Sequence, residues 1–140
     1  MARPAARARG SMSLELVLMT PVLIILFLFL VLVGRLVNVQ SQLDGAARDG
    51  ARAATVARNE GDAQTFAIQA VNESIAGTSF CVGGAAQTAV DTALFAPGGQ
   101  VTVTVTCTTD LTGLGLVPFA GDPVRTGTAS APVDTYRRMD

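Results

Sequence analysis

The sequence predicts an α+β protein, in which a long N-terminal transmembrane helix continues into a small head with a short helix and an antiparallel β-sheet. Three observations predict this class. An almost uninterrupted apolar block occupies Leu16–Val33. Small and apolar residues then recur at three- and four-residue spacing through residues 39–57, as on one face of a helix. Finally, residues 101–108 alternate between apolar and polar side chains, which is the period of a half-buried strand.

The length and composition of the chain limit its organisation. The 140 residues divide into a basic leader without a fold of its own (1–10), a transmembrane helix (11–38), and an extracytoplasmic helix extension and α+β head (39–140). The last part has the usual size of one domain. A net charge of −1 gives no electrostatic reason to expect nucleic-acid binding. Because histidine and lysine are both absent, the usual acid–base and nucleophile sets are largely missing, and we expect no enzyme, cofactor or metal site.

The apolar block has the length and flanks of a membrane span. At about 1.5 Å per residue, Leu16–Val33 gives about 27 Å of helix, close to the hydrocarbon core of about 30 Å. Arg3, Arg7 and Arg9 precede it with no acidic residue among them. Since arginine is enriched on cytoplasmic flanks, we expect a single-pass protein of the cytoplasmic membrane with its N-terminus inside and its head outside.

Two residues in this segment are unusual for a simple span. Glu15 places a carboxylate at the entrance, where a charge is costly and often functional, although a negative charge near a helix start also favours the helix dipole. Pro21 removes a backbone hydrogen bond, so we expect a kink over residues 17–21. An ordinary signal peptide and an uncleaved signal anchor stay open as alternatives. The first is disfavoured because the apolar run is long and no small-residue cleavage pattern follows Gly34.

The helix is predicted to continue beyond the membrane and then to give way to a second helix. Its apolar face consists of Val39, Leu43, Ala46, Gly50, Ala54 and Ala57, and its partner is either a neighbouring subunit or the chain's own sheet. Gly50 suggests a close approach, because glycine costs helix stability. Asn59–Asp62 is expected to break the helix, with Asp62 capping the next one. That second helix, Ala63–Ala76, would bury Phe66, Ala67, Ala70, Val71 and Ile75 and end at Gly77.

The rest of the chain has the period of strands. Residues 101–108 form the clearest strand, with Val101, Val103, Val105 and Cys107 on one face. Pro97–Gly99 predicts a turn before it. Further expectations are a strand over Ser79–Val82, an ambiguous segment Ala85–Ala96, a loop over Gly113–Pro123 with exposed Leu114, Leu116, Val117 and Phe119, and a last strand over Arg125–Val133.

Cys81 and Cys107 both fall in the region expected outside the membrane, where disulfides persist. A bond between them would stabilise the head by about 3–4 kcal/mol on the chain-entropy estimate. Two separate buried thiols are the alternative, and Cys107 also suits the inward face of its strand.

The run G-S-M-S-L-E-L-V-L-M-T-P, from Gly10 to Pro21, resembles the N-terminal signature of TadE-like proteins, the pseudopilins or minor pilins of Tad (tight adherence, Flp-type) pili. In that family the pattern is G-S-x-x-x-E, an apolar stretch and a proline about six residues after the glutamate. Gly10, Ser11, Glu15 and Pro21 occupy those positions. The Ala/Gly/Arg-rich segment Gly45–Arg58 is also similar to the family.

The resemblance implies a pilin-like fold, cleavage by a prepilin peptidase after Gly10, and roles for Glu15 and Pro21 in assembly of a Tad-type pilus. The implied partners are the peptidase, the major pilin and other pseudopilins, inner-membrane platform proteins, an assembly ATPase and membrane lipid. The alternative function is an uncleaved single-span membrane protein with an extracytoplasmic binding domain. A secreted soluble domain would require cleavage after the span instead.

Overall fold

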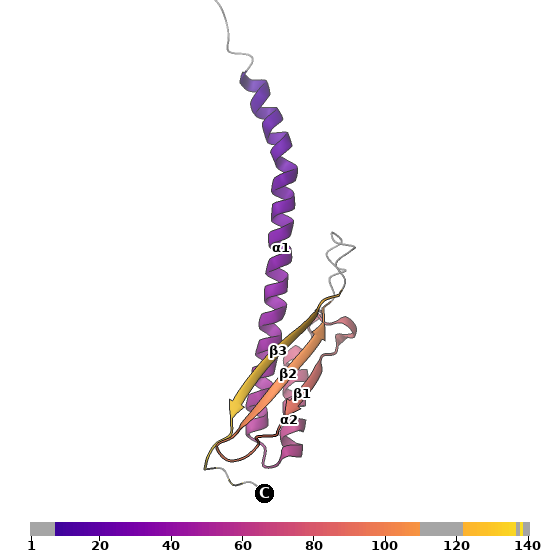
Figure 1. Cartoon of the computed structure of the whole chain (residues 1–140). Helices are drawn as coiled ribbons and strands as arrows, with labels where there is room; N and C mark the ends of the chain where they lie inside the picture. The colour runs from indigo at the N-terminus through magenta and orange to yellow at the C-terminus, as the bar shows by residue number, and fades with distance from the viewer. Residues whose placement is uncertain (1–7, 110–121, 137, 139–140) are drawn as a thin grey trace, which may run out of the picture. The chain divides into compact units, whose positions relative to one another are not determined.

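The computed structural model describes residues 8–109, 122–136 and 138 (Figure 1). It divides into two compact units between Leu36 and Val37. Helix α1 (Ala8–Thr55) contributes to both. Each unit is described by itself, and the second, from Val37 onward, is called the head below.

The described part of the first unit is a helix whose exposed side chains are mostly apolar. Helix α1 begins at Ala8, so residues 8–10 are helical although the basic leader was expected to have no fold. Large apolar side chains on all sides of the helix are exposed, from Leu14 at 64% to Phe27 at 65% and Phe29 at 58%. Such a surface is stable in lipid but not in water, and this helix is long and apolar enough to cross a membrane. The predicted transmembrane-like helix is therefore confirmed.

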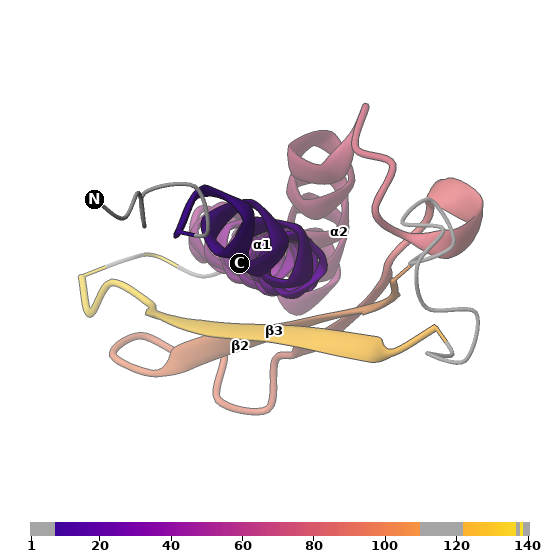
Figure 2. The same cartoon turned by 90° about the horizontal axis from the view of Figure 1, so that it is seen from above.

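The head consists of a sheet with two helices on one of its faces (Figure 2). The sheet has three antiparallel strands in the order β1-β2-β3: β1 is Gln87–Asp91, β2 is Gln100–Thr108 and β3 is Val124–Pro132. The covering helices are the C-terminal part of α1 and α2 (Glu60–Ile75). A single turn of 3₁₀-helix, η1 (Val82–Gly84), lies between α2 and β1. The predicted α+β class with an antiparallel sheet is confirmed.

The core lies between the central strand and the two helices. Alternate side chains of β2 are buried, and they are Val101, Val103, Val105 and Cys107, as predicted. The expected face of α1 is buried against them, including Leu43 and Ala46 at 0% exposure. This face therefore packs on the chain's own sheet. At Gly50 an added Cβ would lie 2.7 Å from Val71 Cγ2 on α2 and 3.3 Å from Val103 Cγ1 on β2, so the glycine permits the close approach that its position suggested.

The second helix differs from its prediction at its start and on its exposed side. The break covers Val56–Asn59, and the N-cap is Asn59 rather than Asp62: Asn59 Oδ1 accepts a hydrogen bond of 2.8 Å from the Asp62 backbone N–H. Asn59 suits this position because its short side chain reaches the free N–H groups of the first turn. Phe66 is 41% exposed and not in the core. The buried stripe keeps a strict four-residue spacing through Ala63, Ala67, Val71 and Ile75.

The strand predictions are confirmed for β2 and, within one residue, for β3. The predicted strand over Ser79–Val82 is wrong, because only Cys81 forms an isolated bridge, to Thr109. Part of the ambiguous segment forms β1, and the turn at Pro97–Gly99 is present. The apolar residues predicted for the loop after Gly113 lie outside the described residues.

Strand β3 lies directly against the helix backbone at Gly127. An added Cβ there would lie 2.6 Å from the Leu43 carbonyl carbon and oxygen and 2.8 Å from the Asp44 nitrogen. One residue away, Gln40 Nε2 donates hydrogen bonds to the Thr126 carbonyl oxygen (3.0 Å) and to Asp44 Oδ1 (3.2 Å). This contact satisfies a backbone carbonyl of β3 and ties the strand to the helix.

Candidate processing and assembly site

Glu15 is the only charged side chain in an otherwise apolar stretch of α1 from Leu14 to Gly34. It is exposed, as are its neighbours Leu14 (64%) and Leu16 (68%). A carboxylate on such a surface either lies at the polar edge of a membrane or takes a cationic partner, because burying an unpaired charge in hydrocarbon is costly. Glu15 is thus available to a group outside this chain.

Pro21 lies inside α1, which continues through it without a break. Because proline has no N–H, the carbonyl oxygen of Val17 lacks its usual helical donor. The adjacent Thr20 hydroxyl donates a hydrogen bond of 2.7 Å to the Leu16 carbonyl oxygen, so this polar side chain has its hydrogen-bond partner within the helix. One carbonyl without a donor is a point at which the helix can open or bend, while the kink over residues 17–21 stays a prediction.

Gly10 and Ser11 lie in the first turn and a half of α1. The first N–H groups of a helix have no partner within it, and glycine weakens a helix further. The Gly10–Ser11 peptide bond therefore lies in a turn that intrahelical hydrogen bonds hold less firmly than the interior of α1. Glu15 follows Ser11 by four residues, which is about one helical turn.

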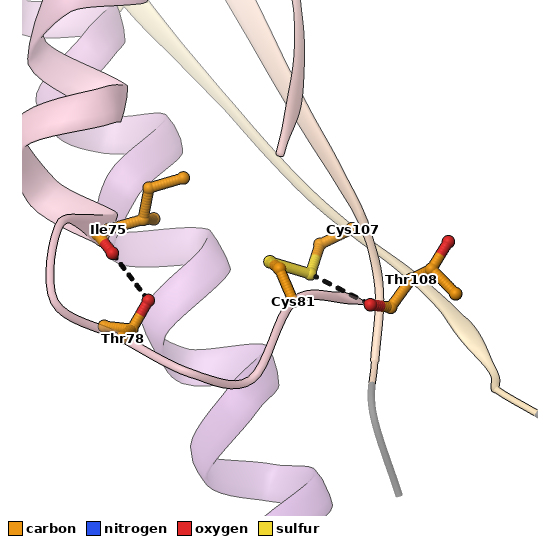
Figure 3. Close-up of a disulfide and its surroundings, with 5 residues drawn as sticks. All are labelled: Ile75, Thr78, Cys81, Cys107 and Thr108. Atoms are coloured by element: carbon orange, nitrogen blue, oxygen red, sulfur yellow. Dashed lines mark hydrogen bonds between the residues drawn. A yellow bond between two sulfur atoms is a disulfide. The ribbon is translucent and has the colours of Figure 1, made fainter. Parts of the chain in front are cut away.

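The two cysteines form a disulfide, so the predicted pairing is confirmed. Figure 3 shows Cys81, in the segment after α2, joined to Cys107 on β2. Their Cα atoms are 5.5 Å apart, and the bond closes a separation of 26 residues. Next to it, the Thr78 hydroxyl donates a hydrogen bond of 2.6 Å to the Ile75 carbonyl oxygen at the end of α2. The disulfide thus fixes the irregular segment between α2 and the sheet.

The structure adds residues that the sequence patterns did not single out. Gln40 and Gly127 join α1 to β3, and their roles depend on a contact between residues far apart in the chain. Among the described residues, no group of three or more histidine, cysteine or acidic side chains is placed to hold a metal ion. The pocket on α2 is a shallow depression of about 520 Å³ lined by Thr65, Ile68, Gln69, Asn72, Glu73 and Ala76.

Comparison with known proteins locates a family likeness in the N-terminal part of the chain. Residues 10–52 match the family model described as TadE-like protein. Neither a curated protein nor a solved structure matches the chain. The matched segment begins at Gly10 and covers Ser11, Glu15, Pro21 and most of α1. The predicted resemblance is therefore confirmed: residues 10–52 of this chain are similar to TadE-like proteins.

Proposed function

We propose that this chain is a TadE-like pseudopilin or minor pilin, that a prepilin peptidase cleaves it after Gly10, and that it acts in the assembly of a Tad-type pilus. The match over residues 10–52 carries this proposal, because it begins at the proposed cleavage site and includes the charged start of the apolar helix. The partners would be the peptidase, the major pilin, other pseudopilins, inner-membrane platform proteins and an assembly ATPase.

The proposed topology is a single pass through the cytoplasmic membrane, with the arginine-rich leader inside and the head outside. Two independent features support this orientation. Arg3, Arg7 and Arg9 precede the span, and such residues are retained on the cytoplasmic side. The head contains a disulfide between Cys81 and Cys107, a bond that persists in extracytoplasmic compartments and is rare in the cytosol.

In this mechanism the chain is a substrate and a subunit, not an enzyme. Hydrolysis of the Gly10–Ser11 bond releases the basic leader and leaves Ser11 with a charged α-amine. The carboxylate of Glu15 on an incoming subunit then pairs with the α-amine of its neighbour. Each charge offsets the unfavourable transfer of the other into apolar surroundings. Glu15 is exposed beside leucines on both sides, so nothing within the described residues of the helix competes with that contact.

Processing is tested by intact mass and N-terminal sequencing of the protein isolated from its own membranes. We expect a chain that begins at Ser11. In a Gly10→Leu variant, whose larger side chain does not fit a site that selects a small residue, we expect the full leader to remain. A wild-type chain that keeps Arg3–Gly10 would favour the signal-anchored binding protein instead, and a start beyond Val33 would indicate secretion.

Assembly is tested by Glu15→Ala. We expect this variant to insert into the membrane at the wild-type level, because the apolar helix is unchanged, but to reduce piliation to the level of a strain lacking the protein. Glu15→Asp is the matched control: it keeps the carboxylate and should retain part of the function. Pilus number is counted by electron microscopy, and membrane content by immunoblot. Wild-type piliation in Glu15→Ala would rule out the assigned role.

A further inference from the structure

We propose that the outer surface of the helices in the head is a contact between copies of this chain, in which Arg48 and Arg52 of one copy bind the depression around Glu73 on α2 of another. This proposal concerns the head alone and does not depend on cleavage after Gly10.

The two arginines form an exposed pair of positive charges on α1. Arg48 and Arg52 are exposed and four residues apart, so they project from the same face of the helix one turn apart. The nearby carboxylates take neutral partners: Asp44 Oδ1 accepts from Gln40 Nε2 (3.2 Å) and Asp49 Oδ2 accepts from the Ser74 hydroxyl (3.2 Å). Within the described part of the chain, neither guanidinium takes part in an ion pair.

Helix α2 presents a surface of the opposite sign. Its sequence contains Glu60, Asp62 and Glu73 but no basic residue. Glu73 lies at the shallow depression on the exposed side of this helix. Its Oε1 accepts a hydrogen bond of 3.0 Å from Gln69 Nε2. The carboxylate therefore has a neutral partner and keeps acceptor capacity for a cation.

The depression also suits the rest of an arginine side chain. Ile68, 41% exposed, and Ala76 give it an apolar lining, against which the arginine stem can pack while its charged end reaches a carboxylate. The side-chain amides of Gln69 and Asn72 lie at the same depression and offer carbonyl oxygens to the second guanidinium. Each amide oxygen can accept a single hydrogen bond from a guanidinium N–H, whereas the Glu73 carboxylate can accept a pair.

A second copy is the occupant that these charges favour. Both patches are on the same molecule and complement each other. Helices α1 and α2 of one head lie side by side on the same face of the sheet (Figure 2), but among the described residues no ion pair joins Arg48 or Arg52 to Glu73. Two complementary patches on one molecule fit a second copy in a two-fold pair, where each arginine pair meets the other copy's depression, or in a head-to-tail arrangement.

The test is photo-crosslinking of the full chain in its membranes, with a benzophenone amino acid in place of the exposed Val56, one turn beyond Arg52, and an equal mixture of isotopically light and heavy copies. Mass spectrometry then identifies crosslinked peptides that join one light and one heavy chain. We expect these to connect position 56 with residues 65–76 of α2. Products with lipid alone, with another protein alone, or with a different segment of the second copy would overturn the proposal.

Charge reversal provides a second readout that does not depend on where the probe sits. The yield of a crosslink from a probe at Thr65, at the edge of the depression, to α1 should fall about tenfold or more in Arg48→Glu with Arg52→Glu, because like charges then meet in the contact. Mixing this variant with Glu73→Arg copies should restore the yield between the two. Asp62→Asn, which removes a charge from α2 outside the depression, is the matched control and should change little. Failure of the mixed pair to recover would refute the contact.

Discussion

Removing the disulfide by Cys81→Ala with Cys107→Ala is expected to lower the free energy of unfolding of the head by about 3.5 kcal/mol. The bond closes a separation of 26 residues, and the estimate is the chain entropy that the unfolded head regains when this loop is open. Alanine is suitable because both cysteines are buried, at 6% and 1% exposure, and a polar replacement would add a desolvation penalty. For a small domain this is a large share of the total stability.

Urea unfolding of the full chain in detergent, followed by far-ultraviolet circular dichroism, measures this change. The wild-type protein in the presence of a thiol reductant is the matched control, since it loses the bond but keeps both sulfur atoms. Its midpoint should fall nearly as far as that of the double variant. Equal midpoints for oxidised and reduced wild-type protein would mean that the bond does not stabilise the head.

Local patterns were sufficient to predict most of the elements. The strand around Val103 was predicted because its apolar residues alternate with polar ones and so share one face of a strand. The buried face of α1 was predicted because its apolar residues recur every three or four positions and so share one face of a helix. The motif that we propose for processing was also recognisable, because Gly10, Ser11 and Glu15 lie within six positions of one another in the sequence.

The errors occur where a local signal has two solutions or where a contact is distant in the chain. Asn59 and Asp62 are both good capping residues, and only the helix start at Glu60 decides between them. Phe66 is apolar yet exposed, because it lies beside the buried stripe of α2, which repeats every four residues from Ala63, and not on it. Gly127 was not singled out from the sequence, since its role depends on Leu43, which is distant along the chain.

Gly127→Ala is expected to destabilise the head by about 3 kcal/mol, at the upper end of the cost of overpacking. The added Cβ would lie 2.6 Å from the carbonyl carbon and oxygen of Leu43 and 2.8 Å from the Asp44 nitrogen. These are backbone atoms in the middle of α1, so they cannot turn aside as a side chain can. Either β3 moves away from the helix or the contact between Gln40 and the Thr126 carbonyl is lost.

Gly45→Ala is the matched control, because it makes the same chemical change on the neighbouring helix where an added Cβ meets nothing within 4 Å. Since alanine is the better helix former, this variant should be more stable than wild type by up to about 1 kcal/mol. The same urea titration measures both variants. If Gly127→Ala lowers the free energy of unfolding and Gly45→Ala raises it, then position 127 requires glycine because β3 lies so close to α1, and not because of the backbone freedom of glycine. If Gly127→Ala matched or exceeded wild-type stability, β3 would not lie this close to α1.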